Sequence, residues 1–407
     1  MNILFLSTEN PFPPDHGHHI RTYNTLYHLA KNNNIYFIGF VKSDSELSLN
    51  RQELEALCVS VDLFVTDYSK SRFLFLITII KSILKGYPFS VYRYFSKKAA
   101  KKMMAILEKH IINIIHIDML HLAIYKNLFD RDRLFLTDHN VEFLRLKRWM
   151  KFERNILKKA FLFFQYLLLK RFEIQSCKEV NKCFVVSDYD KQILAKLTGK
   201  DNFSVIPNGV DTKYFKPIST LNSKRSLVWT GSMSGPYNKD AVIYFITKIW
   251  ERVKKENPDI RIVFVGKDPP QTLIQYSLKD PQIILVGYVN DVRKYMARNN
   301  IFVAPLRCGS GTKIKILNAM AMGLPVITTS IGAEGLEVKS GEDIIIADTP
   351  AEFAFNILKL WRNDKLSLKI GSNARKTAEE KYDWNVVLKE MDTIYESFAK
   401  CIETKRS

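Results

Sequence analysis

The chain has 407 residues, more than one hydrophobic core usually organises, so two domains of about 200 residues each are expected. A hydrophobic content of 46% and an aromatic content of 12% exclude a disordered protein. The net charge is 61 − 42 = +19, yet no nucleic-acid reading motif accompanies it, so nucleic-acid binding is not expected. The five scattered cysteines form no CxxC pair, which argues against disulfides and structural zinc and favours a cytoplasmic location.

The apolar segments predict neither a signal peptide nor a membrane span. The first residues, MNILFLSTEN, lack a basic leader region and are typical of a buried first strand. The longest other apolar stretch, 73–80, stops at Lys81, well short of the ~20 residues that a span requires. We therefore expect a protein that is soluble or peripheral on the inner face of a membrane.

The positive charge is concentrated in two stretches. Residues 70–110 contain ten Lys/Arg against one acid, and residues 145–171 contain nine against one. Both interleave these charges with Phe, Leu, Ile and Tyr, a composition that suits the headgroup layer of an anionic membrane. The alternative is a pair of helices with an apolar core face and a solvated basic face.

Apolar runs alternate with helical patterns in the first half of the chain, which predicts a parallel α/β architecture. A helix is expected from about Ile20, after the turn-rich loop NPFPPDHGHH. Ser187 is predicted to cap the helix DYDKQILAKL. Strands are predicted at 3–7, 35–41, 60–65, 114–117, 134–137 and 182–186.

The segment 201–226 interrupts this pattern with prolines and glycine and is predicted to be a junction between domains. The closing segment, from 383 to about 401, is predicted to form one long amphipathic helix. A second series of strands is predicted at 227–230, 261–265, 283–286, 301–304, 326–329 and 344–347.

The segment APLRCGSGTKIKILNAMAMGLPVITT has the features of a phosphate site. It places a glycine-rich loop between a strand and a helix that opens at about Lys313. In open α/β sheets ligands bind beyond the carboxyl ends of the strands, and a helix N-terminus attracts anions. Gly309 and Gly311 would allow close backbone approach, and Lys313 and Lys315 would add charge. The alternative is a glycine-rich turn into a buried helix; a Walker A pattern is absent.

This segment resembles the donor-site signature of the family 4 glycosyltransferases, which are retaining enzymes of the GT-B fold. VIPNGVDTKYF resembles the interdomain signature of that family, and WTGSMSGPYNKDAVIYF resembles the start of its donor domain. The pieces IRIVFVGKDPP, ILVGYVNDVRKYMARNNIFVAPL and KYDWNVVLKEM continue the match. The resemblance covers nearly all of 205–390; before that it rests on PFPPDHGHHIRTYN and TDHNVEFLRLKR.

The resemblance implies two Rossmann-like domains with a donor cleft between them. The acceptor domain would span 1–205, the donor domain 206–382, and a helix at 383–407 would pack back towards the acceptor domain. The implied reaction is retaining transfer from a nucleoside diphosphate sugar to a glycan or lipid-linked acceptor, in cell-surface polysaccharide or glycolipid synthesis. No metal or other cofactor is implied, and the missing GxGxxG argues against a nicotinamide.

Site residues are carried over from the resemblance position by position. His139 would orient the transferred sugar rather than act as a base, and Tyr288 and Val289 would face the nucleotide base. The implied catalytic residues are His139, Lys267 and Lys313. The implied donor-binding residues are Gly17, Arg21, Gly231, Ser232, Tyr288, Val289, Gly311, Thr312, Asn318 and Glu334.

One position departs from the family pattern. An E-x7-E motif is usual, but Ser310 and Asn318 stand at the two glutamate positions. Asn318 could still bind a ribose hydroxyl, although as a neutral group, and charge-assisted hydrogen bonds are stronger. Two alternatives therefore stay open beside the active transferase: a non-hydrolysing nucleotide-sugar epimerase and a catalytically silent partner subunit.

Three other motifs are predicted to have no metal-binding role. Asp188-Tyr189-Asp190 spells DxD at a predicted helix start, where acids favour the helix dipole, and Asp130-Arg131-Asp132 lies in a turn. His16, His18 and His19 match no usual ligand spacing.

Overall fold

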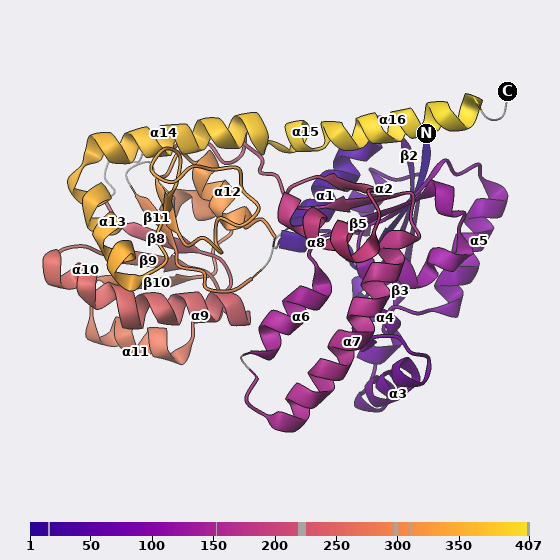
Figure 1. Cartoon of the computed structure of the whole chain (residues 1–407), viewed down its shortest axis with the longest axis horizontal. Coiled ribbons are helices and arrows are strands. Elements are labelled where there is room, and N and C mark those ends of the chain that lie inside the picture. Colours follow the sequence, from indigo (N-terminus) through magenta and orange to yellow (C-terminus); the bar gives the residue numbers. More distant parts are fainter. Residues whose placement is uncertain (15–16, 152, 219–224, 297–299, 310, 405–407) are drawn as a thin grey trace. The chain divides into compact units, whose positions relative to one another are not determined.

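The computed structural model describes residues 1–14, 17–151, 153–218, 225–296, 300–309 and 311–404. It forms two compact units: unit 1 comprises 1–207 and 388–407, and unit 2 comprises 208–387. Each unit is a parallel sheet flanked by helices (Figure 1), which confirms the predicted α/β class. Among the described residues, no helix combines the length and apolar character needed to cross a membrane.

Unit 1 is built on a seven-stranded sheet, and its winding reverses between β1 and β4. Both faces of such a sheet are covered, so its strands are apolar runs; in β1 every residue from Ile3 to Ser7 is buried. In spatial order the strands are β3 (Ser60–Val65), β2 (Asn34–Val41), β1 (Asn2–Ser7), β4 (Ile114–Ile117), β5 (Leu134–Asp138), β6 (Lys182–Val185) and β7 (Phe203–Val205). The helices are α1 (Gly17–Ala30), α2 (Arg51–Glu55), α3 (Arg72–Leu84), α4 (Phe89–Tyr92), α5 (Lys97–Lys109), α6 (Glu142–Met150), α7 (Ile156–Lys178), α8 (Asp188–Thr198) and α16 (Lys389–Thr404).

Unit 2 repeats this plan with a six-stranded parallel sheet. Its winding reverses between β8 and β11, and a π-helical segment, Phe245–Ile249, joins two of its helices. In spatial order the strands are β10 (Ile283–Gly287), β9 (Ile262–Val265), β8 (Leu227–Thr230), β11 (Ile301–Ala304), β12 (Val326–Thr328) and β13 (Ile345–Ile346). The helices are α9 (Pro236–Tyr244), α10 (Trp250–Glu256), α11 (Gln271–Lys279), α12 (Ile314–Ala321), α13 (Pro350–Arg362), α14 (Asp364–Lys381) and α15 (Trp384–Val387).

The boundary between the units, at 207/208, falls inside the predicted junction 201–226. The sequence missed β7 in this segment, because a three-residue edge strand paired with β6 is too short to show a periodic pattern. The prediction of a single closing helix is wrong. The closing segment is two helices rather than one, because its parts pack on different units. Trp384 of α15 packs on Gly209 of unit 2, where a Cβ added to the glycine would lie 2.5 Å from the tryptophan ring. Tyr395 of α16 is instead buried in unit 1.

Candidate functional site

The residues predicted to bind the donor in unit 2 follow the carboxyl ends of its strands. Gly231 and Ser232 follow β8, Lys267 follows β9, and Tyr288 and Val289 follow β10. Gly311, Thr312 and Lys313 lie between β11 and α12, and Asn318 lies within α12. Glu334 follows β12. The winding reversal between β8 and β11 is the kind of switch point at which open α/β sheets bind ligands. The fold therefore brings these dispersed positions to one edge of the sheet.

Two glycines shape the turns after β8 and β9. Gly231 has φ +123° and Gly266 has φ +152°, values that L side chains rarely adopt. A Cβ at Gly266 would lie 1.9 Å from the main-chain oxygen of Gly231, so the two turns touch. The amide of Met233 donates to the carbonyl of Lys267 over 2.9 Å and joins the same turns, while the Lys267 side chain is exposed.

The loop before α12 is held by the IPNG segment. The amide of Asn208 donates to Thr312 Oγ1 over 3.2 Å, and Asn208 Nδ2 donates to the Thr312 carbonyl over 3.1 Å. Lys313 Nζ donates to the carbonyl of Gly311 within the same loop. The first turn of α12 contains no acidic residue that would offset its positive dipole end, which favours an anionic ligand. Ser310 lies outside the described residues.

Lys315 is a cation that the sequence suggested only as an additional charge. Its Nζ donates to Asn238 Oδ1 over 2.8 Å and lies 3.9 Å from the centroid of the Trp229 ring. A Cβ added at Gly231 would lie 3.1 Å from the same nitrogen, which places Lys315 beside the turn after β8. Burial lowers the pKa of Lys315 to about 7. Its position in the first turn of α12, facing the switch point, was the signal that could have identified it.

The remaining predicted donor residues differ in exposure. The Tyr288 side chain is 65% exposed and can receive a flat ligand, while Val289 beside it is partly buried. Asn318 and Glu334 are both partly buried, at α12 and after β12. Their contacts with a donor stay predictions.

In unit 1, His139 follows β5 and Gly17 begins α1 in the loop after β1. His139 Nε2 lies 2.5 Å from the main-chain oxygen of Asp118 and 3.3 Å from its Oδ1. A carbonyl oxygen only accepts hydrogen bonds, so Nε2 of His139 carries a hydrogen. Asp118 follows β4, so the pair lies at the winding reversal of this sheet.

Asp118 is a site residue that sequence reasoning missed. Burial alone raises its pKa, but attraction to His139 and hydrogen bonds from His116 and His139 outweigh burial and hold the pKa below its usual range. Thr22 donates a short hydrogen bond to Asp118 Oδ2. Asp118 could have been found from its position directly after the predicted strand IIHI, which places it at the same sheet edge as His139.

His18 completes a cluster with Asp118 and His139. Its ring lies 4.9 Å from that of His139, and burial followed by repulsion from His139 lowers its pKa to about 4. One ligand atom of each residue lies within 4.8 Å of the others, a spacing that could hold a metal ion. Hydrogen bonding already engages both carboxylate oxygens of Asp118. His19 pairs with Glu9 at 2.7 Å, and His16 lies outside the described residues.

The structure does not support a direct donor contact for Arg21. Its side chain is 1% exposed, and its guanidinium donates to the carbonyls of Ile206 over 2.8 Å and Pro207 over 2.9 Å. Arg21 thus supports the chain just after β7, because a buried guanidinium needs carbonyl acceptors.

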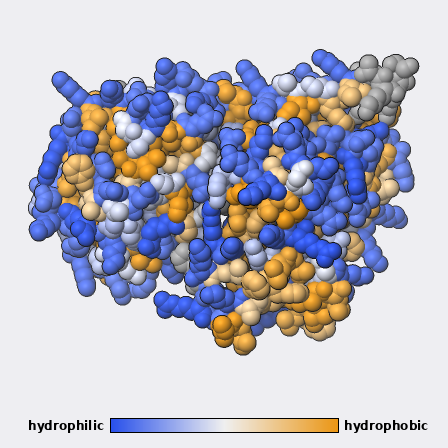
Figure 2. Space-filling model, in the orientation of Figure 1, coloured by the Kyte–Doolittle hydropathy of each residue, from blue (hydrophilic) through white to orange (hydrophobic). Residues whose placement is uncertain are grey.

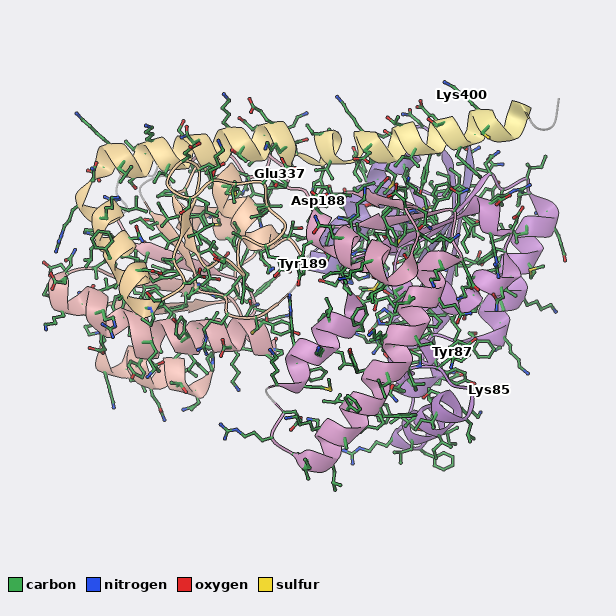
Figure 3. All side chains as sticks on the ribbon, in the orientation of Figure 1. Lys85, Tyr87, Asp188, Tyr189, Glu337 and Lys400 are labelled. Carbon is green, nitrogen blue, oxygen red and sulfur yellow. The ribbon has the colours of Figure 1, made fainter. Side chains whose placement is uncertain are left out.

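The DxD motifs have the structural roles that were predicted. Asp188 and Tyr189 begin α8 (Figure 3), where Ser187 accepts a hydrogen bond from the amide of Asp190 and caps the helix. Asp130 accepts from the amide of Asp132 in a turn.

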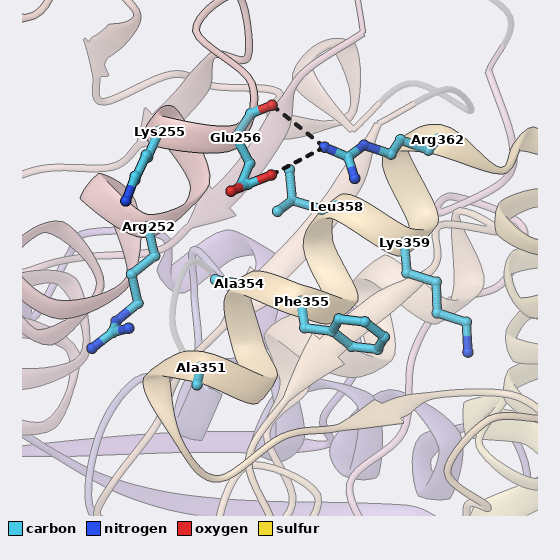
Figure 4. A pocket seen from close by; sticks show the side chains of 9 residues that line it. All are labelled: Arg252, Lys255, Glu256, Ala351, Ala354, Phe355, Leu358, Lys359 and Arg362. Carbon is cyan, nitrogen blue, oxygen red and sulfur yellow. Dashed lines mark hydrogen bonds and ion pairs between the residues drawn. The ribbon is translucent and has the colours of Figure 1, made fainter.

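A surface groove between α10 and α13 is separate from these positions (Figure 4). It has a volume of about 590 Å³ and an apolar floor that includes Phe355 and Leu358. Arg252 and Lys359 lie on its rim, and Glu256 pairs with Arg362 at 3.6 Å. Its lining residues all belong to α10 and α13, and none of them is a predicted donor residue.

Comparison with known families agrees with this geometry. Residues 51–214 match the model of "Glycosyltransferase Family 4", and residues 224–363 match that of "Glycosyl transferases group 1". The two matches together cover most of both units. The chain therefore belongs to the family 4 type of glycosyltransferases, with the GT-B fold of two Rossmann-like domains.

Individual relatives are distant in sequence but extensive in coverage. The chain is 23% identical over 392 residues to an "Uncharacterized 44.6 kDa protein in cps region" of Klebsiella pneumoniae, covering 94% of this chain and 96% of that protein. It is 24% identical to the "Capsular polysaccharide biosynthesis glycosyltransferase CapM" of Staphylococcus aureus, covering 50% of this chain and 54% of CapM. The solved structure of Anabaena HepE in complex with UDP shares the fold, with a TM-score of 0.67, 14% identity and coverage of 98% and 100%.

Proposed function

We propose that this glycosyltransferase moves a sugar from a nucleoside diphosphate sugar to a glycan or lipid-linked acceptor, with retention of anomeric configuration. The observation that carries the proposal is the position of the α12 N-terminus at the switch point of unit 2, with Lys313 and Lys315 at its start. A helix N-terminus flanked by lysines at a sheet edge is suited to a diphosphate. The relative CapM supports a role in cell-surface polysaccharide synthesis, and the HepE complex with UDP supports a uridine nucleotide in the donor.

The proposed chemistry is stabilisation of the leaving diphosphate. Negative charge grows on the phosphate as its bond to the anomeric carbon breaks, and fixed cations with helix N–H groups lower the energy of that state. Lys313, Lys267 and Lys315 are the proposed cations, which supply this stabilisation without a metal. His139, whose Nε2 hydrogen is directed to the main-chain oxygen of Asp118, would orient the transferred sugar.

We further propose that the acceptor is presented at the inner face of an anionic membrane. On α3 only Ser82 is buried and Leu74, Ile77 and Ile79 are half-buried, so its core face is small. Helix α7, by contrast, buries Leu162 and Leu169. Phe73 is 71% and Leu84 79% exposed on α3, and Leu157 is 79% exposed on α7. Figure 2 shows apolar side chains gathered over α3 and the first part of α7. We call the exposed apolar side chains of Phe73, Leu76, Ile80 and Leu84 on α3 and Leu157 on α7 the α3–α7 apolar surface.

Basic residues surround the α3–α7 apolar surface. Arg72, Lys81 and Lys85 are exposed on and after α3 (Figure 3 labels Lys85), and Lys159 is exposed on α7. The two helices are joined through α4: the Phe89 amide donates to Gln165 of α7 over 2.7 Å, and its ring packs on Phe75 of α3 at 5.1 Å. Apolar contact plus cationic attraction is the combination that holds proteins on anionic lipid.

Thermal shift of the full chain with UDP, GDP and their sugars tests the donor class. A ligand present at 100 times its Kd raises the free energy of unfolding of the protein by about 2.7 kcal/mol, a change that a thermal shift readily detects. The bound sugar nucleotide is then incubated with and without a lipid-linked glycan, and the anomeric configuration of the product is read by NMR. Conversion without acceptor would instead identify the epimerase, and lack of nucleotide binding would identify the silent partner subunit.

A further inference from the structure

Arg93, directly after α4, is a cation of unit 1 that has no acidic partner among the residues that the structure describes. Its guanidinium lies 5.5 Å from the ring centroid of Tyr68 and 4.8 Å from that of Tyr94. Its Nη2 donates to the Tyr94 hydroxyl over 2.9 Å, while its buried Nε has no acceptor in the described part of the chain. A guanidinium carries several N–H donors, so most donors of this half-buried side chain are available to a ligand.

The acids that follow strands β1 and β3 at this end of the sheet have other partners. Asp67 follows β3 and pairs with Lys70 at 2.8 Å, and Glu9 follows β1 and pairs with His19 at 2.7 Å. The charge of Arg93 is therefore available to an anionic ligand. The planar fork of a guanidinium matches the oxygens of a phosphate, which it can bind through two parallel hydrogen bonds.

On one side, Arg93 is connected to the segment that holds His139. The Tyr94 ring beneath the same guanidinium lies 6.0 Å from the ring of His121, in the segment after β4. That segment begins with Asp118, whose main-chain oxygen accepts the Nε2 hydrogen of His139. The carboxyl ends of parallel strands share one edge, so Arg93 lies at the edge where ligands of such sheets bind.

On its other side, Arg93 is connected to the α3–α7 apolar surface. The Tyr68 ring packs edge-on against Phe89 at 6.1 Å, and Phe89 packs edge-on against Phe75 of α3 at 5.1 Å. Helix α3 carries most of the side chains of the α3–α7 apolar surface. A row of contacts within unit 1 therefore runs from α3 through Arg93 to the segment after β4.

We propose that Arg93 binds the phosphate that joins a lipid carrier to the acceptor sugar. This inference rests on the proposed function, since it gives each part of a lipid-linked acceptor a place in unit 1. The apolar tail lies on the α3–α7 apolar surface, the phosphate at Arg93 and the sugar towards His139. The order of tail, phosphate and sugar in such a molecule matches the order of apolar surface, cation and histidine. The acceptor class is thus a lipid-linked sugar phosphate and not a free glycan.

Titration calorimetry of the full chain with farnesyl diphosphate, a water-soluble polyprenyl diphosphate, tests the site. Saturating UDP is present, so that the proposed diphosphate site of unit 2 is filled. Arg93→Gln should weaken binding about tenfold or more, the scale of losing hydrogen bonds to a charged group. Arg93→Lys keeps the charge without the planar fork and should give an intermediate affinity. Arg131→Gln is the matched control and should bind as wild type, since Arg131 is 66% exposed in the same unit and pairs with Glu179 at 3.4 Å.

Other sources of phosphate are separated by two further probes. Inorganic pyrophosphate should bind more weakly than farnesyl diphosphate, because it lacks the apolar tail. Arg93→Gln should change flotation with phosphatidylglycerol vesicles little, because the exposed lysines of α3 remain. Equal affinity for pyrophosphate would make this a site for free phosphate, and loss of flotation would make it a site for bilayer headgroups; either result overturns the proposal. Equal affinity of wild type and Arg93→Gln for farnesyl diphosphate also overturns it.

The fate of the transferase function is read separately. Farnesyl diphosphate binding that depends on Arg93, in a chain that binds no nucleotide, would refute the transferase and keep the Arg93 site. That arm is measured without UDP and in the Lys313→Ala background, so that unit 2 does not contribute. Nucleotide binding with equal turnover of a lipid-linked sugar phosphate by wild type and Arg93→Gln would overturn the Arg93 site alone.

Discussion

The Lys315 ammonium donates a hydrogen bond to the side-chain oxygen of Asn238 across 2.8 Å, with the Trp229 ring centroid 3.9 Å from the same nitrogen. In the part of the chain that the structure describes, Lys315 forms no ion pair with a carboxylate. A cation in this setting gains an anionic partner only when a ligand arrives. We therefore expect the lysines at the start of α12 to bind the diphosphate of a nucleotide.

The affinity for UDP should depend on pH through Lys315. Burial lowers the pKa of this lysine to about 7, so it is charged below pH 7 and neutral above. A diphosphate binds the charged form, so affinity should be highest near pH 6 and fall by up to about tenfold per pH unit above 7. Titration calorimetry between pH 6 and 8.5 measures this, and Lys315→Arg should flatten the profile because arginine stays charged. An equal slope in both proteins would contradict the assignment.

Lys313→Ala should lower turnover about 100-fold, the scale of removing one transition-state charge stabiliser. The reason is its place at the N-terminus of α12, next to the proposed leaving phosphate. Initial rates with the identified nucleotide sugar measure the effect. Lys339→Ala is the control, since Lys339 is an exposed lysine of the same unit that pairs with Glu342 at 3.8 Å. Wild-type turnover in folded Lys313→Ala would refute the role.

Gly266→Ala should destabilise the protein and abolish nucleotide binding. The added Cβ would lie 1.9 Å from the Gly231 oxygen, and the φ of +152° disfavours any L side chain, which costs at least about 1–3 kcal/mol. Thermal unfolding with and without UDP measures both effects. Gly235→Ala, just before α9, has open space around its Cβ and should behave as wild type. A normal response to UDP in Gly266→Ala would mean that the paired turns do not form the donor site.

Asn318→Glu should strengthen nucleotide binding about fivefold. A hydrogen bond to a charged group contributes roughly 1 kcal/mol more than one between neutral groups, and Asn318 is predicted to face the ribose. Direct titration with UDP and with 2′,3′-dideoxy-UDP separates the ribose contribution. A gain that persists with the dideoxy nucleotide would place Asn318 away from the ribose.

Replacing Leu76 and Ile80 of α3 with glutamate should abolish binding to anionic liposomes at low salt. Both side chains are 57% exposed on the α3–α7 apolar surface, so the change removes apolar contact and adds repulsion without disturbing a core. Flotation with vesicles containing phosphatidylglycerol measures binding. Leu278→Glu is the control, because Leu278 is 82% exposed but lies in unit 2. Failure of the wild type to float would refute the membrane proposal.

Sequence reasoning located most strands of both sheets. It did so because buried parallel strands are continuous apolar runs, and the runs at 60–65, 114–117, 227–230 and 301–304 coincide with β3, β4, β8 and β11. It missed β7 because three residues at a sheet edge show no period. It also joined α15 and α16 into one helix, because local propensity does not show which unit a helix packs against.

The sequence by itself determined the α/β class, the family and the glycine-rich loop before α12, because these depend on local patterns of apolar residues, glycine and charge. Only the tertiary structure decided which dispersed residues meet. Asp118, His116 and Tyr395 come together through strand order and the return of α16 to unit 1, which no local pattern records. Arg21 shows the same limit, since the resemblance implied a donor contact for it and only the fold shows that its guanidinium lies against the Ile206 and Pro207 carbonyls. Side-chain chemistry is set by the residue, but its partner is set by the fold.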